Sequence, residues 1–253
     1  MVRMTLCRET QGRARATRRE ASKIGAMHLL IFGLIILAIV FGPGIWVQRV
    51  LAKYSEPGDR YSGTGAQLAR HLLNKNGLEN VKIEQTREGD HYDPVEKVVR
   101  LTPDKFDGRS LTAITVAAHE VGHALQDRDG FGPLKLRTRL VKGMRNVERL
   151  GAGILMVSPF IGALTRIPGL GILMFLGGLL TLGSSTLVHL VTLPTEFDAS
   201  FNRALPLLEN DNILKQTDRR HARHILKAAA YTYVSASLMS LLNIARWWAI
   251  LRR

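Results

Sequence analysis

The chain alternates between long apolar runs and polar regions of mixed charge. Residues 27–48 form the first run, and positions 28–48 contain no Asp, Glu, Lys or Arg. A helix rises about 1.5 Å per residue, so a run of this length crosses the roughly 30 Å hydrocarbon core of a bilayer. Residues 150–193 form the second run, whose single formal charge is Arg166. The pattern predicts a transmembrane helix at 27–48 and a transmembrane hairpin at 150–193.

The two ends of the chain give weaker signals. Residues 227–253 are apolar but contain tyrosines and serines, with Trp247 and Trp248 near the end. They indicate either a fourth membrane helix or a helix packed on a domain. Residues 1–26 carry seven Lys or Arg and two acids, and predict a basic, disordered extension. Met27, just before the first run, is an alternative start of translation.

Two polar regions, residues 49–149 and 194–226, lie between the apolar runs. One crossing precedes the first region, and a hairpin with its turn near 165–169 separates it from the second. Both regions are therefore expected on the same side of the membrane, where they can contribute to one site. The predicted fold is a mainly α membrane protein with three or four transmembrane helices and a small α+β domain.

The helices of that domain carry start and stop signals. One is predicted over residues 63–77, beginning at Ser62 or Thr64 and ending at Asn76-Gly77. Another is predicted from Ser110, whose hydroxyl can cap it, to about Gln126.

Short strands are predicted at residues 81–83 and 97–101, on either side of a turn-rich stretch at 90–94. The segment 97–101 is either an edge strand that could pair with an extended peptide or an ordinary strand of the sheet.

Composition excludes some classes of protein. Lys and Arg number 35 against 21 acids, a net charge of +14, but the polar regions mix both signs and aromatics make up 6% of residues. A concentrated basic face with aromatics is absent from the sequence, so nucleic acid is not an expected partner. Cys7 is the single cysteine, which excludes an intrachain disulfide framework and a Cys-rich zinc fold.

His119-Glu120-Val121-Gly122-His123 fits the pattern HExxH. Positions i and i+4 share one face of a helix, so His119 and His123 can bind the same Zn²⁺. Glu120 then lies beside the metal, where a carboxylate can take a proton from zinc-bound water. The neighbouring residues are small or apolar, which favours a buried, zincin-like helix over two surface histidines.

A catalytic zinc site normally has three protein ligands and one open position. Glu196 is the preferred third ligand, because it follows the apolar hairpin on the side that the crossings allow. The alternative role for Glu196 and Asp198 is stabilisation of a helix that starts at Pro194-Thr195. The less favourable ligands considered are Asp127, Asp129, Glu148 and His189.

Three segments resemble one known family. The segments VAAHEVGHALQ, VTLPTEFDAS and HYDPVEKVVRLT are similar to those of the bacterial neutral zinc metallopeptidases of the YugP-like membrane family, and the similarity extends from about Val47 to the C-terminus. The resemblance implies a membrane-embedded gluzincin-type peptidase with one Zn²⁺ per chain. It carries the metal ligands onto His119, His123 and Glu196 and the general base onto Glu120.

The sequence departs from related gluzincins after the ligand glutamate. An aspartate usually stands four residues later and supports a zinc-bound histidine, whereas this chain has Ser200 there. A metal-bound imidazole usually donates its other N–H to a carboxylate or carbonyl. Asp198 and Ser200 are therefore both candidates for this supporting role.

The expected reaction is peptide hydrolysis by zinc-activated water, with Glu120 as the base. An additional donor should stabilise the oxyanion. The candidates are Arg203, His224, Tyr231 and Tyr233. Each of them could also have only a structural role.

The expected partners are peptide or protein substrates, with membrane proteins among the candidates, and the lipid bilayer of the cell membrane. The alternative is a non-catalytic scaffold or adaptor with a structural zinc site. The protein is expected to be multi-pass. Basic residues near the span ends favour a site that faces the cytoplasm if residues 1–26 are excluded, and hardly distinguish the two orientations if they are included.

Overall fold

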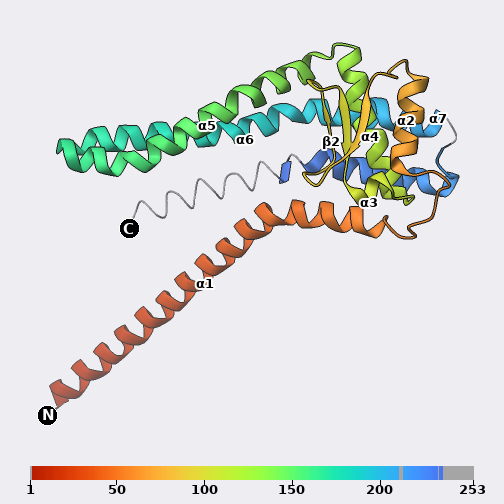
Figure 1. Ribbon diagram of the computed structural model, residues 1–253. Coiled ribbons are helices and arrows are strands. Elements are labelled where there is room, and N and C mark those ends of the chain that lie inside the picture. The colour runs from red at the N-terminus through yellow and green to blue at the C-terminus, as the bar shows by residue number, and fades with distance from the viewer. Residues whose placement is uncertain (1, 211–212, 233, 236–253) are drawn as a thin grey trace. The chain divides into compact units, whose positions relative to one another are not determined.

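The computed structural model describes residues 2–210, 213–232 and 234–235 (Figure 1). The chain divides into two compact units, residues 1–42 and residues 43–253. Helix α1 (Val2–Lys53) begins in the first unit and ends in the second. Among the described residues, one helical segment, Leu30–Lys53, is long and apolar enough to cross a membrane.

In the first unit, the structure continues α1 through residues 2–26, the stretch for which the sequence predicts disorder. This stretch is rich in Arg and Ala, which have high intrinsic helix propensity, so the charge excess does not prevent a helix. Beyond it, large apolar side chains are exposed around the helix: Leu30, Ile31, Phe32, Leu34, Ile35, Ile36, Leu37 and Ile39.

The second unit holds the small α+β domain. Its elements, besides the end of α1, are α2 (Gly65–Lys75), β1 (Lys82–Gln85), β2 (His91–Asp93), β3 (Val98–Leu101), α3 (Pro103–Phe106) and α4 (Leu111–Arg128). The predicted caps are confirmed. Thr64 and Gln67 form a capping box at α2, and the Ser110 hydroxyl accepts from the backbone N–H of Ala113 at α4.

The three strands have the order β1-β3-β2, with β1 parallel and β2 antiparallel to β3. Of the two alternatives for residues 97–101, the ordinary strand is confirmed, because β3 is the central strand and not an edge strand. The turn-rich stretch contains β2, one of the two edge strands. Tyr92 is buried there, pairs with Val99 and donates a hydrogen bond from its hydroxyl to Asp127. These contacts stabilise the extended conformation of the polar segment 91–93.

Helix α4 is the centre of this domain. All of its residues from Leu111 to Gln126 are buried. It contacts α2, α3, β2 and β3, and also α5 (Gly132–Thr165), α7 (Leu205–Asn210) and the π-helical segment η1 (Asp198–Ala204). A helix enclosed on every side holds its polar side chains in a low-dielectric interior, where they need partners.

Helices α5 (Gly132–Thr165) and α6 (Pro168–Phe197) form an antiparallel hairpin that extends from the domain (Figure 1). The predicted turn is confirmed, because Arg166 between them has a left-handed backbone with φ of 55°. The predicted boundary between residues 149 and 150 falls inside α5, so polar domain and hairpin share one continuous helix.

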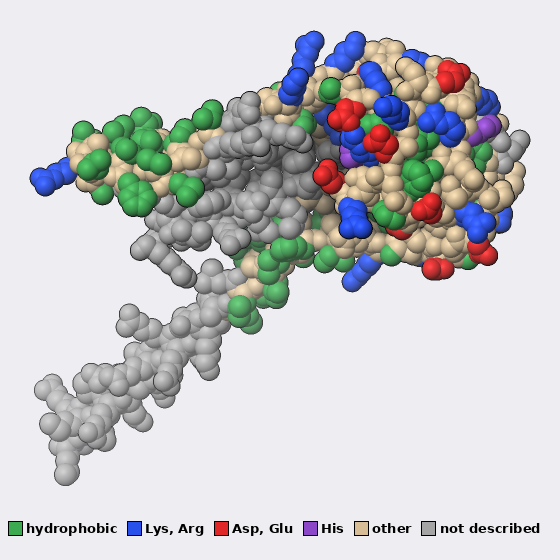
Figure 2. All heavy atoms as spheres, in the orientation of Figure 1, with side chains coloured by type: hydrophobic (Ala, Val, Ile, Leu, Met, Phe, Trp, Pro, Cys, Tyr) green, Lys and Arg blue, Asp and Glu red, His purple; other side chains and the backbone are tan. Residues whose placement is uncertain are grey.

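The predicted helix start at Pro194-Thr195 is wrong, because α6 continues through Pro194 to Phe197. Pro194 removes one helical hydrogen bond, but Thr195 and Glu196 are buried, and their packing holds the helix together. Figure 2 shows apolar side chains gathered on the end of the hairpin away from the sheet. Those exposed are Leu150, Ile154, Met156, Val157, Phe160, Leu164, Ile167, Leu170, Ile172, Leu173 and Leu176.

After η1 follow α7 (Leu205–Asn210), η2 (Gln216–Asp218) and a helical stretch over residues 219–232. Ala222, Ile225 and Leu226 of this last stretch are fully buried in the domain core. The predicted C-terminal helix 227–253 lies largely outside the described residues.

Candidate metal centre

The site begins with two histidines on α4. His119 and His123 are one helical turn apart, and their rings meet edge to face with centroids 4.8 Å apart. They are only 4% and 3% exposed. Their Nε2 atoms are directed to the same place because residues i and i+4 lie on one face of a helix.

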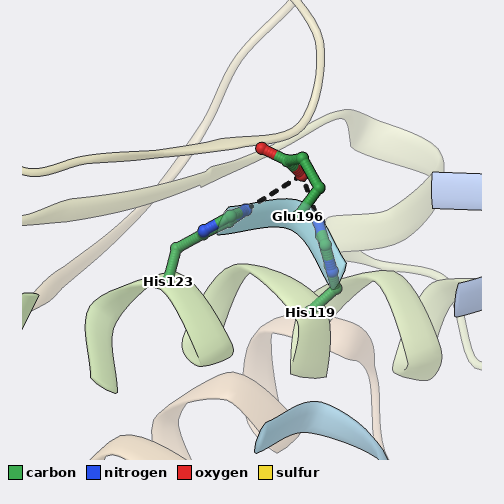
Figure 3. A group of neighbouring side chains, drawn as sticks. All are labelled: His119, His123 and Glu196. Atoms are coloured by element: carbon green, nitrogen blue, oxygen red, sulfur yellow. Dashed lines mark ion pairs between the residues drawn. The ribbon is translucent and has the colours of Figure 1, made fainter. Parts of the chain in front are cut away.

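Glu196, in the last turn of α6, reaches that place from a distant part of the chain (Figure 3). Its Oε2 atom lies 3.3 Å from Nε2 of His119 and 3.3 Å from Nε2 of His123. Ligand atoms at about 2.0–2.1 Å from a tetrahedral zinc are roughly 3.3 Å from one another. The spacing of the three atoms therefore fits a zinc ion.

The hydrogen bonds around the imidazoles also fit a cation. The Ser200 hydroxyl donates to the carbonyl of Leu226, so it accepts from Nδ1 of His119 at 3.0 Å. Gln126 uses its amide N–H groups elsewhere, so its Oε1 accepts from Nδ1 of His123 at 2.9 Å. With the protons on Nδ1, both Nε2 lone pairs face the carboxylate.

Glu196 is 1% exposed, and its carboxylate makes no hydrogen bond with the described residues. Its contacts are those of Oε2 with the two imidazoles and an ion pair of Oε1 with Arg137. Two imidazole nitrogens and a carboxylate oxygen thus converge as acceptors in a buried place. Buried polar atoms need partners, and a nitrogen-rich set with one carboxylate suits Zn²⁺. The residues present fit the metal.

Charge keeps Glu196 in its ionised form. Burial raises the pKa of Glu196. When the imidazoles of His123 and His119 carry a proton on Nε2 in place of a metal ion, they and the guanidinium of Arg137 outweigh burial and hold the pKa well below its ordinary value. Nη1 of Arg137 lies 3.1 Å from Oε1 of Glu196. An ionised carboxylate is the form that binds a metal.

Glu120 borders the same place without belonging to the ligand group. It is 5% exposed, and burial raises its pKa to about 7, with His119 lowering this pKa and the carboxylate of Asp90 raising it. A carboxylate with a pKa near neutrality can both accept and return a proton.

The structure separates the two candidates for supporting a histidine. Ser200, which stands where related gluzincins have a supporting aspartate, contacts His119 directly. Asp198 contacts neither imidazole. Its Oδ2 accepts from Gln126, which in turn contacts His123, and from Arg203. Ser200 thus orients one ligand, and Asp198 acts on the other through Gln126.

Close packing of α4 on η1 brings these supports into place. A Cβ atom added to Gly122 would lie 2.6 Å from the backbone oxygen of Ala199, a separation that real side chains do not adopt. The glycine within the HExxH pattern therefore lets the segment with Asp198 and Ser200 approach the histidines.

A cavity of about 330 Å³ opens onto the three side chains. Edge strand β2 lies along it with His91 and Tyr92. The remaining lining residues are Leu51, Gly89, Asp90, Val116, Glu120, Arg137, Ala229 and Thr232.

Three of the candidates for an oxyanion donor, Arg203, His224 and Tyr231, are described by the structure and do not line this cavity. Tyr231 packs against Trp46 and Phe197, and the ring of His224 lies near Trp46 and Tyr54. Arg203 is held by Asp198 and Asp129. Tyr233 lies outside the described residues.

Sequence reasoning missed two residues of the site. The contact of Gln126 with His123 could have been predicted, because Gln126 follows His123 by three positions on the same helix. Arg137 had none, since its contact with Glu196 joins helices that only tertiary packing brings together.

Fold and site together define a mainly helical protein with a small sheet, in which a buried His-His-Glu cluster can hold one metal ion beside a cavity. Residues 29–252 match the family described as "Putative neutral zinc metallopeptidase", and the chain belongs to this family. It is also similar to "Putative membrane protease YugP" of Bacillus subtilis (strain 168), with 36% identity over 213 residues, 83% of this chain and 91% of that protein. No solved structure matches the chain. The family resemblance drawn from the three sequence segments is confirmed.

Proposed function

We propose that the protein is a membrane-embedded zinc-dependent endopeptidase that hydrolyses peptide bonds with Glu120 as general base. The observation that carries the proposal is the position of Oε2 of Glu196, 3.3 Å from both imidazole nitrogens, beside a buried carboxylate and an open cavity. Three ligands with room for water are typical of a hydrolytic zinc site, whereas a structural site usually has four protein ligands.

Each residue then has a defined task. Zinc, when bound, supplies a Lewis acid that polarises the scissile carbonyl and lowers the pKa of a bound water. Glu120 accepts a proton from the attacking water as the new C–O bond forms. It then passes this proton to the amine nitrogen as the C–N bond breaks. Ser200 and Gln126 keep the imidazole protons on Nδ1, so the Nε2 lone pairs stay directed at the site.

The substrate is proposed to lie along β2. This strand is at the edge of the sheet and borders the cavity through His91 and Tyr92. An unpaired strand edge can bind an extended peptide through its backbone groups. Pairing with an extended peptide is therefore proposed for residues 91–93 and not for residues 97–101.

Glu120→Gln tests the mechanism. The variant keeps the size of the side chain but cannot accept the proton, so hydrolysis should fall by at least about 10²-fold while one zinc per chain is retained. Casein cleavage in detergent and metal analysis of the same purified samples measure the two quantities. Activity equal to that of the wild type would contradict the base assignment. Zinc-loaded wild type without peptidase activity would favour the scaffold.

Membrane embedding is proposed for Leu30–Lys53 and for the hairpin over residues 150–193, giving a multi-pass protein of three spans, or of four if residues 227–253 also cross. The support is the exposed apolar surface of both segments, which water does not favour. The site is proposed to face the cytoplasm. An epitope tag inserted at exposed Asp59 should then be protected from external protease in intact cells, and digestion of the tag would reverse the orientation.

A further inference from the structure

The two carboxylate oxygens of Glu196 have different surroundings. Oε2 faces the imidazoles of His119 and His123, while Oε1 is turned away from them and lies 3.1 Å from Nη1 of Arg137. The Arg137 side chain is 17% exposed and borders the cavity. Figure 3 shows the carboxylate with one oxygen toward the histidines and the other directed elsewhere.

This division of the oxygens matters for coordination. A carboxylate can bind a metal through one or both oxygens. If both oxygens of Glu196 bound zinc beside two imidazoles, the protein would fill four positions and leave less room for water. A guanidinium that holds Oε1 leaves Oε2 as the metal-binding atom.

We propose that Arg137 is a positioning residue, which holds Oε1 of Glu196 so that the carboxylate binds the metal through Oε2 alone and the fourth position stays open. The proposal rests on the proposed function only in taking zinc as the metal. Arg137 lies near the start of α5 and Glu196 at the end of α6, so the contact also joins the two helices of the hairpin at the metal site.

Two other roles for Arg137 give different expectations. An arginine that only neutralises a buried carboxylate would leave the coordination number unchanged when removed, and lysine would replace it fully. An arginine that only binds substrate would leave metal affinity unchanged. The contact of Nη1 with Oε1 argues against a role confined to substrate binding, because the guanidinium contacts the ligand itself. The coordination number of the Arg137 variants separates positioning from neutralisation.

The test uses the full chain in detergent, with Arg137→Met, Arg137→Lys and the control Arg139→Met. Arg139 is an exposed arginine two residues along α5. Zinc affinity is measured by competition with a chromophoric chelator, and the coordination number by the visible spectrum of Co²⁺ bound in place of zinc. Four-coordinate Co²⁺ absorbs much more strongly than five-coordinate Co²⁺.

Wild type and Arg139→Met should show the intense four-coordinate spectrum. Arg137→Met should bind zinc about 10-fold or more weakly, the usual effect of losing a residue that orients a ligand, and should give the weak five-coordinate spectrum. Arg137→Lys keeps the charge but has no planar fork, so it should change in the same direction by a smaller amount, and it serves if the Met variant does not fold.

Arg137 variants with the affinity and spectrum of Arg139→Met would overturn the proposal. Neither readout requires peptide hydrolysis. Zinc-loaded wild type without peptidase activity would therefore refute the proposed function and leave this inference standing.

Discussion

At the scale of single residues, the supports of the two histidines decide how well the site is preorganised. Ser200 accepts from His119 and donates to the carbonyl of Leu226, so its single proton is committed to the backbone and its oxygen faces the imidazole as an acceptor. The serine replaces a carboxylate with a neutral acceptor. It orients the ring while adding no charge to an interior that already contains Glu120 and Glu196.

Ser200→Ala removes the acceptor for Nδ1 of His119, and the ring can then rotate or shift its proton to Nε2. We expect zinc to bind about 10-fold more weakly, measured by chelator competition. Ser62→Ala, at an exposed serine, should keep wild-type affinity. Equal affinities in the two variants would show that Ser200 does not orient the ligand.

At the scale of elements, the site depends on how closely α4 and η1 approach. π-Helical turns are often found at functional sites, and η1 follows Glu196 almost directly. It carries Asp198 and Ser200, and its backbone at Ala199 lies against Gly122. One glycine on α4 therefore controls how closely the helix with both histidines approaches η1, which directly follows the end of α6 that carries Glu196.

Gly122→Ala should force η1 away from α4. Overpacking of this kind destabilises by about 1–3 kcal/mol, and the displacement of Ser200 should also weaken zinc binding. Thermal unfolding and chelator competition measure the two effects. The control is Gly143→Ala in α5, where an added Cβ meets no described atom within 4 Å. A Gly122 variant as stable as this control would mean that the close approach has no energetic role.

At the scale of the whole molecule, hydrogen bonds from Arg60 and Tyr61 to Asp218 join the segment after α1 to η2. Arg60 donates to both oxygens of Asp218, and the hydroxyl of Tyr61 donates to Oδ2 at 2.6 Å. Asp218 is fully buried. Because residues 219–232 follow η2 directly, this contact helps to fix the helix whose carbonyl at Leu226 holds Ser200.

The hydrogen bonds from Arg60 lower the pKa of Asp218 below its ordinary value, against burial, which raises it, and Tyr61 lowers it further. A carboxylate with a lowered pKa stabilises the fold above its unfolded pKa of about 4, and this contribution is lost as pH falls below that value. The free energy of unfolding of Asp218→Asn should be lower than that of the wild type by about 1–3 kcal/mol at pH 7. This difference should become smaller at acidic pH.

Unfolding of Asp218→Asn and wild type across this pH range measures the difference. Asp59→Asn, at an exposed position, should follow the wild type. A difference that is constant with pH would show that the ion pair does not contribute through its charge.

The sequence by itself determined what depends on neighbours in the chain. The spacing of His119 and His123, the cap at Ser110, the hairpin turn at Arg166 and the apolar runs all follow from helix geometry and local composition. The choice of Glu196, 73 positions after His123, came from the order of the apolar runs, and the resemblance of its segment to a known family agreed with it.

Only the tertiary structure decided which strand is central, that α6 continues through Pro194, that Ser200 rather than Asp198 contacts His119, and that Arg137 contacts Glu196. These features depend on packing between segments distant in sequence, such as Gly122 on Ala199 and Arg137 on Glu196. The free energy of such contacts comes from burial and charge in three dimensions, so no pattern along the chain records it.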